Sequence, residues 1–332
     1  MPVTATVTVR DIAREAGVSI GTVSRALKNQ PGLAEETRRH VRAVAERLGY
    51  DSGKLQRRKL RKLAFLLHRQ HNTLANTPFF SAVLHGVEEA CRIEGIVPSF
   101  LSVGPTDPVA DQLRLHDPDA LLCAGFFEPE LLNVFRDTGK PVALIDHLAD
   151  GLLSVNPDNQ SGGYLATQHL IRAGRKRIAF LSGSLAHYSI RERFRGHRQA
   201  LFDSGILADP HLEAMTPPGM DVEPGAYIAM QQLLSLDRPP DAVFAFNDSA
   251  ALNAMRAIID AGLSMPRDIA VVGFDDIAQA ALAHPPLTTL RIDKEELGRA
   301  GVDLVLHGGG NRTLPVELVI RDSTVAQQRI SA

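Results

Sequence analysis

The sequence predicts two unlike parts, a small all-α head and a larger α/β body. In the first 50 residues, apolar side chains recur at helical spacing. From residue 62 onward, short apolar runs of strand length alternate with longer segments of mixed polarity, which is the pattern of β–α–β units with right-handed crossovers. A chain of 332 residues is also long enough for two or three domains with cores of their own.

Charge divides the chain near the same place. Residues 1–62 contain 14 Lys and Arg against 6 Asp and Glu, a net charge of +8. The remaining 270 residues contain 22 against 32, a net charge of −10. A basic head on an acidic body predicts that only the head meets a polyanion.

The head begins with two short amphipathic helices. Thr8 and Asp11 form a capping-box pattern at the start of the first, and Gly17 suits the position just past its end. Ser19 then caps a second helix, which has two different faces. Its apolar stripe comprises Val23, Ala26 and Leu27. Two short helices joined by residues 17–19 form a helix-turn-helix, the unit that places its second helix in the major groove of DNA.

The opposite face of the second helix is small, hydroxylic and basic. By spacing alone, a plain helical hairpin with a solvated polar face would be the simpler interpretation. A DNA-reading helix needs such a face, with Arg25 expected on a base or phosphate and Ile20 on a thymine methyl. The predicted DNA contacts here are Thr8, Ser19, Ile20, Gly21, Thr22, Ser24, Arg25 and Lys28.

A third helix is expected from Glu35 to Leu48, and a basic linker follows it. Six of the nine residues 54–62 are Lys or Arg. Such a run is commonly a solvated linker, but it also suits binding to DNA phosphates. The DNA contacts predicted in the linker are Lys54, Arg57, Arg58, Lys59 and Leu60.

The segment from Val9 to Leu27, VRDIAREAGVSIGTVSRAL, closely resembles the opening of the lactose-repressor (LacI/GalR) family of bacterial regulators. The third helix and its end at Tyr50 resemble the same family. The resemblance implies a DNA-binding domain at 1–53, a hinge at 54–62 and an effector-binding, dimerising body at 63–332. That body would have the type I periplasmic-binding-protein-like fold, with an N-lobe of about 63–157 and 291–321 and a C-lobe of about 158–290 and 322–332.

The hinge departs from the family pattern, in which a leucine wedges into the minor groove and kinks the DNA. Ser52 replaces the family's proline, and Lys59 holds the wedge position with Leu60 one residue later. An ammonium group is costly to bury between bases. Either Leu60 becomes the wedge or the hinge binds without a deep kink. We favour the second, because one residue turns a helix face by roughly 100°.

In the body, apolar runs predict buried parallel strands. These strands are expected at 63–67, 97–101, 120–123, 142–145, 177–181, 242–246, 269–273 and 318–321. A helix is expected after Asn76-Thr-Pro-Phe-Phe80, a motif that resembles the family's first strand–helix unit. The segment Val155-Asn-Pro-Asp-Asn159 resembles the family's crossover into the second lobe.

Polar side chains at predicted strand ends indicate a ligand site, because open α/β sheets bind ligands there. Asp146, Asn247 and Asp275 follow apolar strands, and Arg191 and Arg193 lie in an arginine motif expected before a helix. Carboxylates and a forked guanidinium can clamp the vicinal hydroxyls of a sugar. The predicted effector-binding residues are Phe79, Phe80, Asp146, Arg191, Arg193, Asn247 and Asp275. Asp248 is left equally open between a ligand contact and a helix cap.

The effector is expected to be a sugar or sugar derivative. The chain has no Trp, which argues against a flat purine. Arg191 with the nearby His187 leaves room for an anionic group, so a sugar acid or sugar phosphate stays open. The sequence leaves the effector's identity, the operator, and the choice between inducer and corepressor undecided.

The sequence holds no catalytic or phosphate-binding motif and no metal-ligand spacing among its 12 His, so neither enzyme activity nor a cofactor is expected. With two cysteines, no signal peptide and no membrane-length apolar run, a cytoplasmic protein is expected. These features predict a ligand-responsive DNA-binding regulator, a repressor of a carbohydrate-related operon. It would act as a homodimer on a near-palindromic operator, because the eight residues after Thr324 hold no apolar heptad for a tetramer. The alternative is a stand-alone small-molecule binding protein or enzyme whose N-terminal helices only pack.

Overall fold

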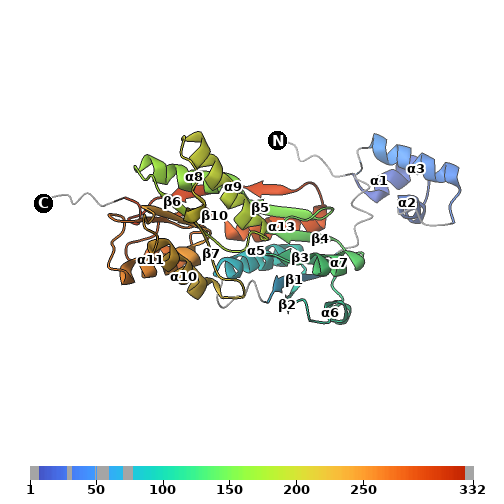
Figure 1. The fold of residues 1–332 in the computed structure, drawn as a ribbon. Coiled ribbons are helices and arrows are strands. Elements are labelled where there is room, and N and C mark those ends of the chain that lie inside the picture. The colour runs from blue at the N-terminus through green and yellow to red at the C-terminus, as the bar shows by residue number, and fades with distance from the viewer. Residues whose placement is uncertain (1–6, 28–31, 49, 51–59, 70–77, 326–332) are drawn as a thin grey trace. The chain divides into compact units, whose positions relative to one another are not determined.

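The computed structural model describes residues 7–27, 32–48, 50, 60–69 and 78–325 (Figure 1). The chain forms two compact units, residues 1–60 and 61–332. Five predicted DNA contacts lie outside the described residues, namely Lys28, Lys54, Arg57, Arg58 and Lys59.

The described residues of the first unit form the helices α1 (Val9–Ala16), α2 (Ile20–Leu27) and α3 (Glu35–Arg47). The capping box at α1 is confirmed: Thr8 N donates to Asp11 Oδ2 at 2.9 Å, and Asp11 N donates to Thr8 Oγ1 at 3.4 Å. Gly17 ends α1 in the left-handed region, with φ of 65°. Ser19 Oγ accepts from Thr22 N at 3.1 Å, as a cap of α2 should. The buried stripes of the helices meet in one core, in which Ile12, Val23 and Val41 are fully buried.

The second unit contains two parallel sheets. The first sheet has the strand order β11-β5-β4-β3-β1-β2. Its strands are β1 (Lys62–His68), β2 (Val97–Val103), β3 (Ala120–Ala124), β4 (Val142–Ile145), β5 (Leu153–Pro157) and β11 (Arg312–Leu314). Its helices are α5 (Pro78–Glu94), α6 (Val109–His116), α7 (Pro129–Asp137) and α13 (Lys294–His307). We refer to this layer as the first lobe.

The second sheet, with the order β7-β6-β8-β9, forms the second lobe. Its strands are β6 (Ile178–Ser182), β7 (Glu213–Met215), β8 (Ala242–Ala245) and β9 (Ala270–Val272). Its helices are α8 (Asn159–Arg172), α9 (Tyr188–Asp203), the 3-10 turn η1 (Pro210–Leu212), α10 (Val222–Leu234), α11 (Asp248–Asp260) and α12 (Ala278–Leu282). Both sheets consist of parallel pairs only, so the carboxyl ends of their strands gather at one edge of each sheet.

The chain passes between the lobes three times. It leaves the first lobe after β5, returns through β10 (Thr289–Ile292) into α13, and leaves again through β12 (Val316–Val319) after β11. β10 and β12 pair antiparallel and form a two-stranded ribbon, which we call the crossing ribbon.

The structure corrects three sequence expectations. The late strand expected at 318–321 runs over 316–319. Arg191 and Arg193 lie inside α9, which begins before them at Tyr188. The three-residue strands β7 and β11 were not predicted, because their side chains are exposed or half-buried and leave no apolar run.

Two glycines let α8 and α9 lie in contact. A Cβ atom on Gly163 would lie 2.1 Å from the carbonyl oxygen of Arg193, and one on Gly196 would lie 2.0 Å from that of Gln160. No other residue type leaves room for this approach. The packing fixes the part of α9 that carries Arg193.

The described residues also bear on the cysteines, on metal binding and on membrane spanning. Cys91 and Cys123 are buried free thiols, and burial raises the pKa of Cys91 to about 11. Among the described residues, no group of three His, Cys, Asp or Glu is placed to hold a metal ion. Within the same part of the chain, no helix has the length and apolar character needed to span a membrane.

Candidate functional site

The outward face of α2 carries most of the described DNA-contact candidates. Ser19, Ile20, Gly21 and Arg25 are exposed, and Ile20 remains 52% exposed although it is a large apolar side chain. Thr22 and Ser24 are half-buried beside them. This face therefore offers a methyl surface, hydroxyls and a guanidinium to a partner, the groups that contact base edges and phosphates.

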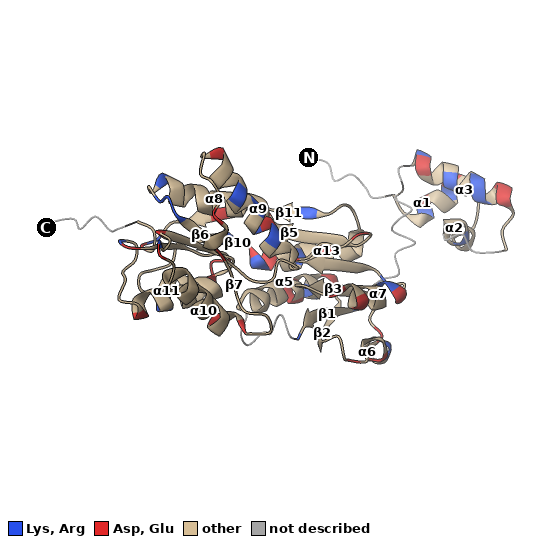
Figure 2. Cartoon of the chain, viewed as in Figure 1, with Lys and Arg blue, Asp and Glu red and all other residues tan. Residues whose placement is uncertain are grey.

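The remaining described candidates flank α2 in the chain. Thr8 is exposed at the start of α1, where its hydroxyl bonds Asp11 Oδ2 at 2.7 Å, and Leu60 is half-buried at the end of the first unit. Arg25 Nε lies 3.4 Å from the carbonyl oxygen of Gly21 one turn earlier. Figure 2 shows that basic residues also recur along α3. The first unit thus combines an exposed helix face with positive charge.

A second set of groups comes together between the lobes. Asp146 follows β4 of the first lobe, Ser189 and Arg193 lie on α9, and Asp275 follows β9. Ser189 Oγ donates to Asp146 Oδ2 at 3.3 Å across the two lobes. Arg193 Nη2 lies 3.6 Å from Asp275 Oδ1. We call these four residues the interlobe cluster.

Arg193 is the centre of this cluster, and its side chain is only 4% exposed. Its Nε donates to Asn159 Oδ1 at 2.9 Å, and its Nη1 donates to the carbonyl oxygen of Phe246 at 2.6 Å. Its guanidinium carbon lies 3.7 Å from the centre of the Phe274 ring, a close cation–π contact. The guanidinium is therefore held in one orientation before any ligand arrives.

Burial changes the protonation of the two carboxyl groups. It raises the pKa of Asp146 to about 7, against the attraction of Arg193 and with help from the negative charge of Asp275. It raises the pKa of Asp275 to about 6, opposed by Arg193 and Lys294. Both groups can therefore accept or donate hydrogen bonds near neutral pH, depending on their surroundings.

Several buried polar atoms in this region have no hydrogen-bond partner among the described residues. They include Asp146 Oδ1, Asn159 Nδ2 and His147 Nδ1. Burying a polar atom without a hydrogen-bond partner costs free energy, unless another molecule supplies the bond. Ligand hydroxyls would supply that partner.

An aromatic wall borders the cluster. The ring of Phe126, just after β3, stacks on His187 at 4.7 Å and meets His147 edge-on at 5.5 Å. Burial and the charge of Arg191 lower the pKa of His147 to about 4, so this imidazole is neutral at pH 7. Phe126 and His187 come from different lobes, so their contact also joins the lobes.

The other predicted effector residues take different positions. Phe79 and Phe80 are buried in the first turn of α5 and meet edge-to-face at 4.9 Å. The Arg191 side chain is 41% exposed, and its Nη1 donates to the carbonyl oxygen of Leu185. Asn247 Oδ1 caps α11 by accepting from Ala250 N at 2.8 Å.

Asp248 has a structural role. Asn247 is the cap of α11, and Asp248 is fully buried beside the loop after β9. Its carboxylate accepts from the backbone N of Ile277 at 2.9 Å and from Thr289 Oγ1 at 2.5 Å. Of the two roles that the sequence left open for Asp248, a ligand contact and a helix cap, the structure rules out the cap.

The structure brings together Asp146 and Asp275, which the strand-end pattern predicted, and Arg193, which the arginine motif predicted. Sequence reasoning missed Ser189, Asn159, Phe126 and His147. His147 and Phe126 each lie two residues after the end of a strand, so a slightly wider form of the rule used for Asp146 could have found them. Two cavities, of about 240 and 120 Å³, lie elsewhere, beside α6 and β7 respectively. The cluster is thus buried between the lobes and lines neither of these two cavities.

Comparison with known proteins gives the same two-part division. Residues 8–52 match the family profile described as bacterial regulatory proteins, lacI family, and residues 167–324 match a periplasmic binding protein-like domain. The ribose operon repressor of Escherichia coli (strain K12) is 32% identical over 323 residues, which cover 90% of this chain and 92% of that protein.

Solved structures resemble nearly the whole chain. A complex of the transcriptional regulator CelR with cellobiose has a TM-score of 0.73 and 28% identity, and covers 96% of this chain and 99% of its own. The lac repressor dimer bound to operator and the anti-inducer ONPF has a TM-score of 0.70 and 26% identity, covering 97% and 100%. The head and body therefore occur together in both of these regulators.

Proposed function

The chain belongs to the lacI family of bacterial regulatory proteins, and from this premise we propose that it is a transcriptional repressor controlled by a small sugar-like effector. The head would bind operator DNA, and the interlobe cluster would bind the effector. The stand-alone binding protein or enzyme is not favoured, because the curated relative that matches nine-tenths of the chain is itself a repressor. Its target is proposed to be a carbohydrate-related operon.

The DNA-binding role is supported by the exposed face of α2. Ile20 would touch a thymine methyl, and Arg25 a base edge or phosphate. Gly21 would allow close approach of the helix backbone. The linker from residue 54 to residue 62 lies largely outside the described residues, so its proposed contacts rest on its basic sequence.

The effector site is carried by one observation, the buried Asp146 Oδ1 and Asn159 Nδ2 that lack partners beside a fixed Arg193. An acceptor, a donor and a guanidinium in one place match a molecule whose hydroxyls both donate and accept. The proposed effector is therefore a sugar. Arg191, whose side chain is partly exposed on α9, and His187 just before this helix leave a sugar acid or sugar phosphate as variants of the same class.

We propose that the protein acts as a homodimer. Apolar side chains stay exposed on neighbouring elements of the first lobe, namely Ile93 on α5 (71%) and Val97 on the edge strand β2 (67%). In the second lobe, Leu282 on α12 is 84% exposed. Burial against a second copy would remove these surfaces from water. A two-fold dimer would also match a near-palindromic operator.

A gel-shift titration tests the proposal. DNA upstream of the protein's own gene is titrated with the full chain at physiological salt, alone and with D-ribose, cellobiose, a sugar phosphate or a purine base. We expect a specific complex whose affinity changes with one sugar. A response to the purine alone would reject the sugar class, and failure to prefer this DNA over a scrambled sequence would reject this DNA as its operator. Light scattering of the same sample should give a dimer mass.

A further inference from the structure

The loop after β9 carries backbone strain at the effector site. Asp275 and Asp276 are consecutive non-glycine residues with positive φ, at 116° and 51°. Such conformations are strained for residues with a side chain and persist only where the surroundings hold them. We call residues 274–277 the effector loop, since it includes Asp275 and the Phe274 ring beneath Arg193.

Two arginines hold this loop through the Asp276 side chain. Arg321 Nη2 lies 2.6 Å from Asp276 Oδ1, and Arg291 Nε lies 2.7 Å from Asp276 Oδ2. Each carboxylate oxygen therefore has its own guanidinium. The Asp276 side chain is only 11% exposed, and burial alone would raise its pKa, but the bonds and charges of Arg321 and Arg291 lower it overall. Asp276 thus stays ionised in a buried position.

The backbone of the loop is held as well. Lys294, the first residue of α13, donates its ammonium to the carbonyl oxygens of Asp275, Asp276 and Ile292. Asp275 N donates to the carbonyl oxygen of Leu290 at 2.8 Å. The loop is therefore attached at both side chain and backbone to the segment that leads into the first lobe.

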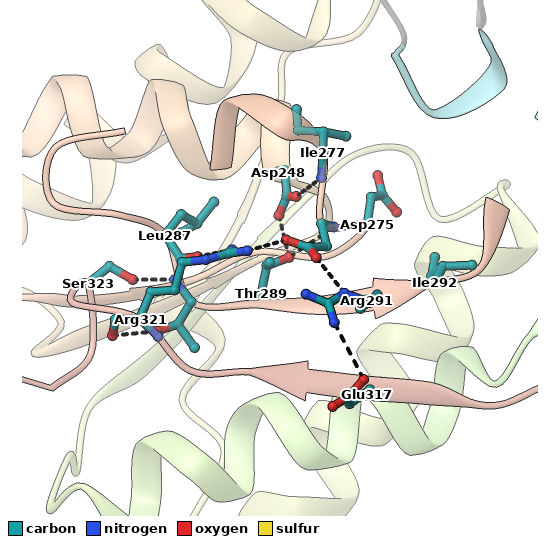
Figure 3. Close-up of polar contacts among 12 residues, drawn as sticks. Asp248, Asp275, Ile277, Leu287, Thr289, Arg291, Ile292, Glu317, Arg321 and Ser323 are labelled. Carbon is teal, nitrogen blue, oxygen red and sulfur yellow. Dashed lines mark hydrogen bonds and ion pairs between the residues drawn. The ribbon is translucent and has the colours of Figure 1, made fainter. Parts of the chain in front are cut away.

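The two arginines that bond Asp276 come from the crossing ribbon and from the segment just after it. Arg291 lies in β10, and Arg321 lies two residues beyond the end of β12. Figure 3 shows the guanidinium groups of Arg291 and Arg321 directed from these two segments toward the loop that carries Asp275 and Ile277. Arg321 also donates to the carbonyl oxygen of Leu287 at 2.8 Å, which ties the two segments together. Asp276 therefore links the effector loop to the crossing ribbon and to the segment that follows it.

We propose that Asp276 is a positioning residue for effector binding, which holds the strained effector loop against the crossing ribbon so that Asp275 faces Arg193. This inference rests on the proposed function, because it assigns Asp275 to the effector site. Asp276 itself touches neither Arg193 nor, on this account, the effector. Its loss would let the loop relax and move the Asp275 carboxylate away from the position in which it meets a ligand.

Hydrogen–deuterium exchange of the ligand-free full chain tests the positioning role. Asp276→Asn keeps the side-chain shape and removes the charge. We expect the backbone amides of residues 275–277 to exchange at least 10-fold faster in this variant. The matched control is Glu317→Gln, because Glu317 lies 3.7 Å from Arg291 Nη1 but is 74% exposed and outside the loop. Unchanged exchange in Asp276→Asn, or equal acceleration in the control, would overturn the proposal.

A second variant covers the case in which Asp276→Asn fails to fold. Arg291→Gln removes one arm of the clamp from its exposed side, since the Arg291 side chain is 51% exposed. It should accelerate exchange at the same amides by a smaller factor. Asp276→Glu restores the charge and should recover part of the protection. A folded Arg291→Gln protein with full protection of the loop would count against the clamp.

Titration calorimetry with D-ribose tests whether Asp276 affects ligand affinity. We expect at least 10-fold weaker binding to Asp276→Asn than to the wild type and no change for Glu317→Gln, while all three proteins bind operator DNA equally without sugar. Equal D-ribose affinity in wild type and Asp276→Asn would overturn the proposal. If D-ribose fails to bind even the wild type, that result counts against ribose as the effector alone, and the exchange measurement still decides the role of Asp276.

Discussion

The helix-turn-helix and the interlobe cluster differ in how far apart their contacts lie in the chain. The head is set by bonds three residues apart, such as Thr8 with Asp11 and Ser19 with Thr22. The cluster is set by pairs that are distant in sequence, such as Asp146 with Ser189. The reading face of the head therefore rests on local contacts, whereas the cluster depends on how distant segments of the body pack.

The largest expected effect breaks the packing that places Arg193. Gly163→Ala puts a methyl group against the carbonyl oxygen of Arg193, where a Cβ has no room. We expect the free energy of unfolding of the body to fall by about 3 kcal/mol. The control is Gly104→Ala, whose new Cβ would make only an ordinary contact at 3.8 Å. Calorimetric unfolding of both variants decides, and equal stability would contradict the tight contact of α8 with α9.

The next effect concerns the reading face of the head. Arg25→Ala should weaken operator binding by ~1–3 kcal/mol if Arg25 meets a base edge. Its fold should survive, because Arg25 lies on the exposed side of α2. Arg267→Ala is the matched control, since it removes one exposed charge from the body. A gel shift at physiological salt that gave equal affinities for Arg25→Ala and wild type would reject the assignment.

A smaller effect should follow pH in the cluster. Folding raises the pKa of Asp146 from 3.8 to about 7 through burial, so the folded state favours the protonated acid. The stability from this group is full below pH 3.8 and is lost as pH rises through about 7. Asp146→Asn cannot ionise and should lose less stability between pH 6 and pH 8, by on the order of 1–2 kcal/mol. Parallel pH profiles in urea unfolding would contradict the burial of Asp146.

The smallest expected effect is a gain in the stability of the head. Gly21→Ala adds a methyl group that meets only Ser19 Oγ, at 3.7 Å. Because alanine favours helix over glycine, α2 should gain up to about 1 kcal/mol. Thermal unfolding of the head should move upward, whereas the same change at Gly163 moves the body downward. A destabilised head would contradict the open space that the structure shows around the Cα atom of Gly21.

The sequence predicted the head almost completely, because caps and stripes act over a few residues. The alternation of strands and helices with the family resemblance predicted the two-lobed body. The strand-end rule predicted Asp146 and Asp275, and the arginine motif of the family predicted Arg193. The sequence could not predict the Ser189–Asp146 contact or the attachment of Asn159 to Arg193, since these depend on how α8 and α9 pack across the lobes. A late strand was expected at 318–321, but its antiparallel pairing with β10 in the crossing ribbon was not, because that pairing joins segments far apart in the sequence.

The placement of α9 explains two further differences. Arg191 and Arg193 were expected together before a helix, but within α9 they are separated by about 200° of helical turn. Arg193 therefore enters the cluster while Arg191 stays partly exposed. Asn247, expected as an effector contact, caps α11, whereas Asp248, left open between a ligand contact and a cap, is buried and accepts from Ile277 N and Thr289 Oγ1. These roles depend on where each helix begins, which the position of a residue after a strand does not reveal.

The most direct test of the account measures how one site affects the other. Fluorescence anisotropy gives the affinity of labelled operator DNA for the full chain, with and without the sugar that emerges from the panel. The wild type should show an effector-dependent change of ~1–3 kcal/mol in operator affinity. Arg193→Ala and Asp275→Ala should bind operator without sugar as the wild type does and lose that change. An undiminished sugar response in both variants would contradict the claim that the interlobe cluster is the effector site.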